Sequence, residues 1–349
     1  MSVKDLLTRA VLFDKDKREL FLTIVSSQVK SGRPYHDIFK PMLRSKNRYY
    51  RQLAEKSLNP ASEYFASQYG GLFPEHTARL LKLSQRFNAV SPFIDYSLNN
   101  PDKKSLSIFA TVLAPNFMEI LLSLIFSSLF VALYLYNDAI AESFVDLSSS
   151  LPYMIGGLFV SNAFPLTVLA LGSSAVYIYY LNNYSPLRET LKKTGAYRFS
   201  DAKYALELFR IISIMTAGRS AEGMSIRVLF SELSAVFGTS NLRRHQFSIL
   251  RREISKGTPL YLALQQSEIL DHDSLELFKG LAPDESIPEI SKASLAIADL
   301  LTARTKVEIR LFSKSLTFFL LLYLSLSFVA VIEVSLGGGA GILSQQPGL

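Results

Sequence analysis

Four histidines carry most of the catalytic and metal-binding potential of this sequence, and they lie far apart. They are His36, His76, His245 and His272. Zinc hydrolases bind their metal through clustered ligands such as H-E-x-x-H, because histidines four residues apart share one face of a helix. None of the four has a second histidine within helical reach, so we expect surface or capping histidines and no metal site. The chain has no cysteine, which excludes thiolate ligands, disulfides and cysteine nucleophiles.

A glycine-rich segment near the C-terminus, Gly337 to Gly341, is the nearest approach to a phosphate-binding loop. An ATPase loop needs G-x-x-x-x-G-K-[ST], whose backbone N–H groups and lysine hold the phosphates, and this motif is absent from the sequence. The segment follows an apolar run and opens no helical pattern, so it predicts a flexible tail over 335–349. We therefore expect no catalytic residue and no cofactor, and the energy for any active process must come from a partner.

Four arginines, Arg243, Arg244, Arg251 and Arg252, form the remaining charged constellation. They fall on one broad arc of a predicted helix, because positions seven and eight apart return to nearly the same azimuth. Such an arc is either a surface facing solvent or lipid headgroups, or a docking face for an acidic partner. No aromatic-and-basic motif accompanies it, so nucleic acid is not an expected partner.

Three apolar runs without ionisable residues cover much of the remaining sequence: 120–137, 147–187 and 315–332. A helix of ~18 to 20 apolar residues crosses the ~30 Å of a bilayer's hydrocarbon core. The runs predict transmembrane helices at 117–137, 152–182 (core 163–181) and 315–334. The middle run is long, but Pro152, Gly156 and Gly157 leave only a short apolar stretch over 151–160. We therefore expect one span there, with Pro165 as the cause of any kink.

Basic residues flank the predicted spans on one side only. Lys103 and Lys104 precede the first span, Arg188 and Lys192 follow the second, and further Lys and Arg residues precede the third. The loop 138–151 contains no Lys or Arg. By the positive-inside rule, the N-terminus is cytoplasmic and the C-terminus periplasmic, in the inner membrane of a bacterium. A charged N-terminal segment also argues against a cleaved secretory signal.

The two cytoplasmic segments, 1–116 and 183–314, are predicted to be repeated helical-bundle domains. Gly32 and Pro34 stand at a predicted helix end and the next helix start, and Gly218 repeats the glycine 186 residues later. Pro60 and Pro259 each open a predicted helix, 57 residues before Phe117 and Leu316 respectively. Each domain is therefore predicted to be attached to its own span.

Helical periodicity is the dominant signal in both domains. One apolar stripe includes Leu20, Phe21 and Val25, and further stripes recur over 78–87, 204–216, 242–254 and 295–309. Period-2 alternation and hairpin turns are nearly absent. The expected fold class is all-α: a polytopic membrane protein with three transmembrane helices and two helical bundles.

The order of domain, span, short acidic loop, span, domain, span and tail resembles the F component of type II secretion systems and its type IV pilus counterpart, the inner-membrane platform proteins. The family's helix-ending "aG-x-p" turn is matched at 30–34 and 216–220, and its "G-x-s/p-L-x-x-A-L" helix opening at Gly257 to Leu264. The family's Gly-Glu pair is missing, because the corresponding segment 279–285 reads KGLAPDE. This departure suggests a divergent branch, of the type IVb pilus kind.

The resemblance implies a non-enzymatic platform that couples a cytoplasmic hexameric ATPase to the extraction of pilin or pseudopilin from the membrane. It also implies contacts with membrane lipids, with other inner-membrane assembly proteins and with further copies of the chain. The alternative is a subunit of a transporter or channel. Transporters place ionisable residues inside their spans, whereas Glu119 and Glu333 lie only at span margins.

Overall fold

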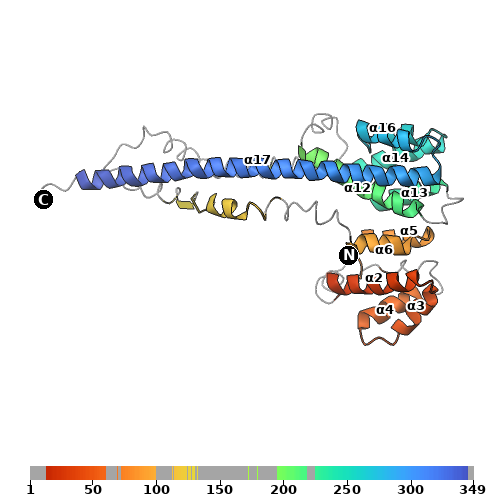
Figure 1. Cartoon of the computed structure of the whole chain (residues 1–349). Helices are drawn as coiled ribbons and strands as arrows, with labels where there is room; N and C mark the ends of the chain where they lie inside the picture. Colours follow the sequence, from red (N-terminus) through yellow and green to blue (C-terminus); the bar gives the residue numbers. More distant parts are fainter. Residues whose placement is uncertain are drawn as a thin grey trace. The chain divides into compact units, whose positions relative to one another are not determined.

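The computed structural model describes residues 13–59, 69, 72–99, 112, 114–123, 125–126, 128–129, 132, 172, 179, 195–217 and 225–344. Every regular element that these residues form is a helix, which confirms the all-α class (Figure 1). The helices are α2 (Lys15–Lys30), α3 (Tyr35–Met42), α4 (Arg48–Ser57), α5 (Glu75–Arg86), α6 (Val90–Asn99), α12 (Gly195–Thr216), α13 (Ile226–Phe237), α14 (Asn241–Ser255), α15 (Leu260–Ser267), α16 (His272–Leu281) and α17 (Ile287–Ser344).

The chain divides into two compact units. Unit 1 contains Met1–Lys103 and Leu181–Thr305, and unit 2 contains Lys104–Tyr180 and Lys306–Leu349. Most residues of both predicted bundles therefore belong to unit 1. The long helix α17 contributes residues to each unit.

Polar side chains begin several of the helices. Asp14, Asn47 and Asp271 each accept a hydrogen bond from a backbone N–H of the first turn of α2, α4 and α16 respectively, at 2.9 to 3.1 Å. Ser240 does the same for α14 at 3.3 Å. These caps satisfy N–H groups that have no partner within the helix.

The chain turns in the same way at Gly32 and at Gly257. Each glycine follows a helix end and takes a left-handed φ, +75° and +82° respectively. Pro34 and Pro259 then stand immediately before α3 and α15. The predicted glycine and proline punctuation is confirmed at all four residues, with Pro259 at the cap rather than at the first helical position.

The backbone hydrogen bonds of the two corners also correspond. The amide of Arg33 donates to the carbonyl of Gln28 at 3.3 Å, and the amide of Thr258 donates to that of Glu253 at 3.1 Å. This bond, spanning six residues, is the mark of a Schellman helix ending. The two corners are therefore one backbone motif used twice.

This motif belongs to a three-helix unit that the chain contains twice, displaced by 225 positions, as from Gly32 to Gly257. Helices α2, α3 and α4 correspond to α14, α15 and α16, with bounds that agree within one residue after this shift. Buried positions coincide as well: Phe21 with Gln246, Leu22 with Phe247, Val25 with Leu250, Phe39 with Leu264, and Leu53 with Phe278. The equivalence lies at an offset different from the 186 residues predicted from Gly218.

Aromatic rings fill the core beneath α2. The ring of Phe21 lies 6.1 Å from those of Tyr69 and Phe73, centroid to centroid, and 6.4 Å from that of Phe39. All four side chains are fully or almost fully buried. The prediction that Leu20 shares this stripe is wrong, because its side chain is 55% exposed and Leu22 is buried instead.

Helix α12 forms the corresponding core element of the C-terminal half. Leu208, Ile212 and Met215 are fully buried, which confirms the predicted stripe. Salt bridges join the two halves of unit 1 through other helices: Arg86 pairs with Glu232, and His76 Nε2 lies 3.1 Å from a carboxylate oxygen of Glu207.

Helix α17 is continuous from Ile287 to Ser344. The flexible tail predicted from 335 is therefore wrong as far as Ser344. Glycine lowers helix propensity by only about 1 kcal/mol per residue, and no proline interrupts the chain between Pro288 and Pro347. Over the described residues, no helix is both long and apolar enough to cross a membrane.

Several predictions lie outside the described residues. They are the helix opening at Pro60, the turn at Gly218, the loop 138–151, and the second span 152–182 apart from Gly172 and Tyr179. Within the first predicted span, residues 117–123, 125–126, 128–129 and 132 are described, and all are helical.

Candidate functional site

The predicted arginine arc on α14 is divided by the fold, because Arg243 points into unit 1. Its side chain is 9% exposed, and Nη2 lies 2.6 Å from a carboxylate oxygen of Asp201 on α12. Nη1 donates to the Gln246 side chain at 2.9 Å. The guanidinium carbon lies 3.8 Å from the ring centroid of Tyr204, a cation–π contact. The prediction that Arg243 belongs to an exposed docking face is therefore wrong.

Helix geometry explains this result. Arg243 shares the inward face of α14 with Leu242, Gln246, Phe247 and Leu250, all of which are buried. A buried guanidinium needs a charged partner and hydrogen-bond acceptors, and α12 supplies both the carboxylate and the aromatic face. Arg243 therefore fixes α12 against α14.

Tyr204 and Gln246 extend this cluster. Burial raises the pKa of the Tyr204 hydroxyl, while the charge of Arg243 acts in the opposite direction. Gln246 Nε2 donates at 3.0 Å to the carbonyl of Glu268, a residue with a left-handed φ of +52°. The cluster thus connects α12, α14 and the end of α15, and its role is structural.

Arg244, Arg251 and Arg252 remain on the exposed side of α14. Arg252 pairs with the buried carboxylate of Glu253 at 3.1 Å, and Lys256 approaches the same carboxylate at 2.9 Å. The hydrogen bond from Lys256, with a second from Arg252, holds the pKa of Glu253 below its usual range. The exposed basic face therefore consists of Arg244 and Arg251, with Arg252 partly engaged.

Glu253 also contributes to the corner at Gly257. Its second carboxylate oxygen accepts from Thr258 Oγ1 at 3.3 Å, while its backbone carbonyl accepts from the Thr258 amide. Glu253 was not singled out in the sequence. An acidic residue four positions before a Gly-x-Pro corner, with a hydroxyl side chain at x, is a signal that would have identified it.

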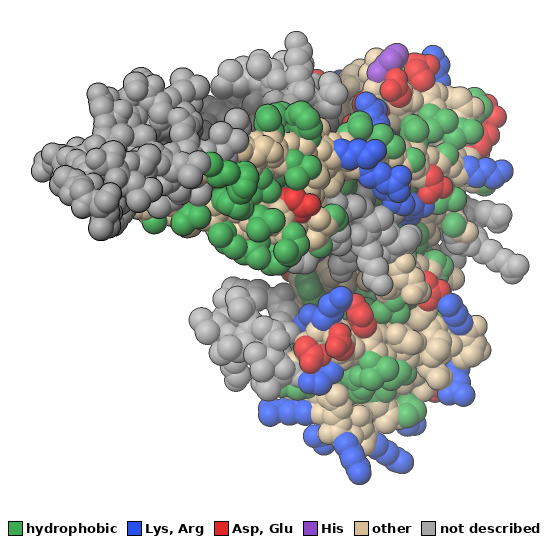
Figure 2. Space-filling model, turned by 60° about the vertical axis from the view of Figure 1, so that its left-hand side comes forward, with side chains coloured by type: hydrophobic (Ala, Val, Ile, Leu, Met, Phe, Trp, Pro, Cys, Tyr) green, Lys and Arg blue, Asp and Glu red, His purple; other side chains and the backbone are tan. Residues whose placement is uncertain are grey.

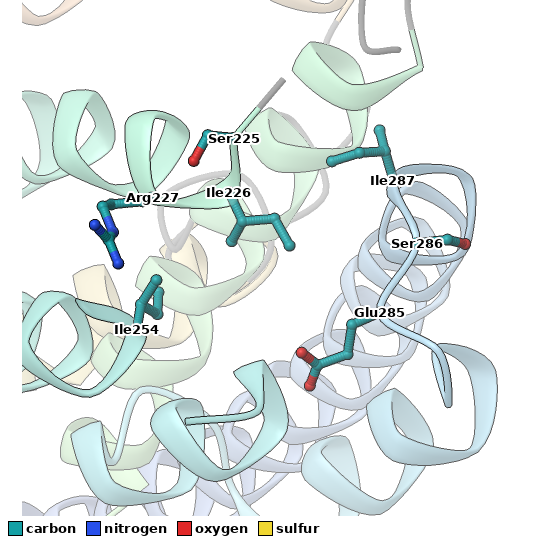
Figure 3. Close-up of a pocket in the computed structure, with 7 residues that line it drawn as sticks. All are labelled: Ser225, Ile226, Arg227, Ile254, Glu285, Ser286 and Ile287. Carbon is teal, nitrogen blue, oxygen red and sulfur yellow. The ribbon is translucent and has the colours of Figure 1, made fainter. Parts of the chain in front are cut away.

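An open cleft of about 470 Å³ lies beside this corner, between the start of α13, the end of α14 and the α16–α17 turn (Figure 3). Its apolar lining comes from Ile226, Ile254 and Ile287. Its two charged side chains serve as helix caps: Arg227 donates to the carbonyl of Ser255 at 3.2 Å, and Glu285 accepts from the amide of Tyr261 at 3.1 Å. The lining contains no histidine to activate a serine hydroxyl.

The histidines show no metal-binding arrangement in the described part of the chain. No group of three or more His, Asp or Glu side chains there is able to hold a metal ion. His76 lies against Glu207, and its ring packs edge-on against Phe237 at 5.3 Å between centroids. His36 lies beside Asp37 on the surface.

A polar contact in unit 2 was missed by the sequence analysis. Asn116 is 1% exposed, and its Nδ2 donates to the carbonyl of Val112 at 2.6 Å and to Ser313 Oγ at 3.1 Å. Thr317 Oγ1 donates to Asn116 Oδ1. We call this set of bonds the Asn116 clasp, and it joins the start of the first apolar run to α17.

Ring packing continues the same contact further along both segments. Phe126 and Phe328 lie edge to face, with centroids 6.0 Å apart. Phe126 follows Asn116 and Phe328 follows Thr317, so the residues 116–126 and 317–328 run in the same direction.

Comparison of the chain with protein families, with curated proteins and with solved structures found no match.

Proposed function

We propose that the chain is a three-span inner-membrane platform protein of a type IV pilus or type II secretion machine. In this proposal it couples a cytoplasmic assembly ATPase to the extraction and polymerisation of pilin or pseudopilin. It acts as a scaffold and performs no chemistry of its own. The N-terminus and the two helical bundles are cytoplasmic, and the C-terminus is periplasmic.

Exposed apolar side chains on α17 support a third span. Leu311, Phe312, Phe318 and Phe319 are each about 60% exposed, and Leu321, Leu322 and Tyr323 about half exposed. Figure 2 shows hydrophobic side chains gathered on the described surface of this region. Large contiguous apolar surfaces are rare on water-facing proteins, and hydrocarbon is the solvent that suits them.

The parallel contact between the first and third apolar runs is the observation that carries the proposal. Both runs are predicted to begin at the cytoplasmic side, because lysines or arginines precede each of them. Two spans with the same orientation must run parallel. The Asn116 clasp joins their predicted cytoplasmic ends, and the Phe126–Phe328 contact lies deeper along both.

The same contact supports a single span in the middle run. A chain that crosses the membrane outward in its first span and outward again in its last must return once, or an odd number of times, between them. Two spans within 147–187 would leave the first and last spans antiparallel. The parallel pairing therefore favours the interpretation with one span at 152–182.

Polar groups within the clasp also suit a membrane. Without water to compete, Asn, Ser and Thr side chains join neighbouring membrane helices by hydrogen bonds worth ~0.6 to 2 kcal/mol each. Asn116, Ser313 and Thr317 are residues of this kind at the expected depth, near the cytoplasmic boundary of both predicted spans.

The partners follow from the platform role. The sequence has no nucleotide-binding loop, so a separate ATPase must supply the energy. The exposed Arg244 and Arg251 are the part of the predicted docking face that stays available to an acidic partner, and unit 1 belongs to the cytoplasmic side in this proposal.

Reporter fusions test the topology. A periplasm-active reporter enzyme joined within 138–150 or after Leu349 is expected to be active, and the same enzyme joined after Ser240 silent. Activity at Ser240 would contradict the three-span topology. Deletion of the gene is expected to abolish surface fibres or secretion, and the tagged chain is expected to co-purify with a hexameric ATPase.

A further inference from the structure

The two three-helix units carry opposite charge at equivalent positions. Lys46, Arg48 and Arg51 in the first unit correspond, after the shift of 225 residues, to Asp271, Asp273 and Glu276 in the second. All six side chains belong to α4 or α16 or to the residues immediately before them, and all six residues are exposed. The same backbone thus presents a basic surface once and an acidic surface once.

The basic surface extends beyond these three residues. We call it the basic corner, and its members are Arg33, Lys40, Arg44, Lys46, Arg48, Arg51 and Lys56. Residues 33–56 contain these seven bases and only two acids, Asp37 and Glu55, a net charge of +5. None of the seven forms an ion pair with another described residue. Figure 2 shows Lys and Arg side chains gathered at the edge of the lobe formed by α2 to α4.

The acidic surface is its counterpart. We call it the acidic corner, and its members are Glu268, Asp271, Asp273, Glu276, Asp284, Glu285 and Glu289. Residues 268–289 contain these seven acids and one base, Lys279, a net charge of −6 with His272 neutral. Arg304 pairs with Asp271 and lies 3.7 Å from Asp273. Glu276 and Asp284 are exposed and form no ion pair with another described residue.

The contacts within one copy of the chain use other helices. The two halves of unit 1 meet through α5, α6, α12 and α13, as in the Arg86–Glu232 and His76–Glu207 pairs. No ion pair printed by the described residues joins the basic corner to the acidic corner. Both corners are therefore available to another molecule.

We propose that the basic corner of one copy docks on the acidic corner of a second copy, so that the chain assembles head to tail. Opposite charges at matched spacing make the two surfaces complementary in shape pattern and in sign. A contact between two different surfaces of identical chains is heterologous, and it produces rings or open filaments rather than a closed dimer. This inference deepens the homo-oligomer of the proposed function and rests on it for the expectation that copies meet in one membrane.

Charge reversal with mutual rescue tests the proposal on the full chain in detergent micelles. One variant carries K46E, R48E and R51E, and the other carries D273K, E276K and D284K, which leaves the α16 cap Asp271 intact. Because the chain has no cysteine, a single E55C in one copy and a single K279C in the other report contact of α4 with α16 through a short cross-linker.

We expect each reversal variant alone to lose at least about tenfold in cross-linked product, because several charge pairs become repulsive. Mixing the two variants, with E55C on the first and K279C on the second, is expected to restore the product. Raising the salt from 50 to 500 mM is expected to weaken the wild-type product, since the charges are exposed.

A matched control changes the net charge by the same amount elsewhere. K203E, R244E and R251E reverse three exposed bases on α12 and α14 and are expected to leave cross-linking unchanged. An equal loss in the control, or no rescue on mixing, would overturn the proposal. If the first variant instead loses binding to vesicles of anionic lipid while its cross-linking persists, the basic corner faces a membrane. Each of these results is independent of the reporter fusions, so the two proposals fail separately.

Discussion

The first three-helix unit, α2 to α4, and the second, α14 to α16, have the same backbone plan and differ in what their surfaces carry. Both place buried side chains at the same positions and both turn at a glycine with left-handed φ. Their exposed helices α4 and α16 nevertheless carry charges of opposite sign. The comparison indicates that burial and the Gly-x-Pro corner set the fold, while the exposed positions are free to specify partners.

The two units also differ in how their first helix is fixed. Arg18 and Arg243 stand at the same distance before the corner glycine, 14 residues in each case. Arg18 is half-buried and donates to the carbonyl of Phe13 at 2.8 Å. Arg243 is buried in an ion pair with Asp201 and stacks on Tyr204. One position thus serves a local cap in the first unit and a contact between helices in the second.

The largest difference between the units is expected at this pair of arginines. Arg243→Ala should lower the free energy of unfolding by about 2 to 3 kcal/mol, because it leaves Asp201 without its buried partner and opens space beside Tyr204. Arg18→Ala should cost about 1 kcal/mol, the worth of one hydrogen bond. Chemical denaturation of the full chain in detergent, followed by circular dichroism, measures both. Equal losses would mean that Arg243 has no special role.

A smaller effect, and an equal one, is expected at the two corner glycines. Gly32→Ala and Gly257→Ala should each destabilise the protein by about 1 to 2 kcal/mol, the cost of a left-handed φ for a residue with a Cβ. A Cβ at either position meets no atom within 4 Å, so steric contact with neighbours adds nothing. Thermal melting of the two variants compares them directly. A loss at only one glycine would argue against a shared corner.

The smallest effect is expected at Glu253, which has no charged counterpart in the first unit, since Gln28 stands at that position. Its folded-state pKa is lowered by the hydrogen bonds from Lys256 and Arg252. The stability it contributes is therefore fully present above the usual pKa of a glutamate and is lost as the pH falls through the lowered value.

Melting temperatures of the wild type and Glu253→Gln should accordingly differ at neutral pH and converge in acid. Gln28→Ala serves as the control and should show no such convergence. A constant difference between wild type and Glu253→Gln across the pH range would show that ionisation of Glu253 does not matter.

The sequence predicted the helical class and the corners because both depend on local signals. Gly32 and Gly257 end helices through their own backbone freedom, and Pro34 and Pro259 limit where the next helix starts. The stripe of Leu208, Ile212 and Met215 also predicts its own burial by its spacing. Such features need no knowledge of the rest of the chain.

The candidate site depended on distant partners, and there the sequence was insufficient. Arg243 and Arg244 are adjacent arginines with the same local pattern, and only the arrival of Asp201 and Tyr204 from α12 decides which of them is buried. Leu20 and Leu22 pose the same problem on α2. Asn116 occurs between a proline and an apolar run, where an asparagine normally indicates a turn, and its partners Ser313 and Thr317 lie some 200 residues away in the sequence.

The 225-residue equivalence was missed because few identical residues mark it. Gly32 and Gly257, and Pro34 and Pro259, are identical, but Phe21 corresponds to Gln246 and Arg48 to Asp273. A search by identity favours the Gly-Arg match at 218, whereas burial and helix bounds reveal the second correspondence.

The parallel pairing of the first and last apolar runs is the central claim, and cysteine cross-linking in native membranes measures it most directly. The cysteine-free chain allows a clean pair, F126C with F328C, and a matched antiparallel pair, N116C with F328C. The account predicts efficient intramolecular disulfide formation for F126C/F328C and little for N116C/F328C. Cross-linking of N116C/F328C in preference to F126C/F328C would contradict parallel spans, and with them the three-span topology.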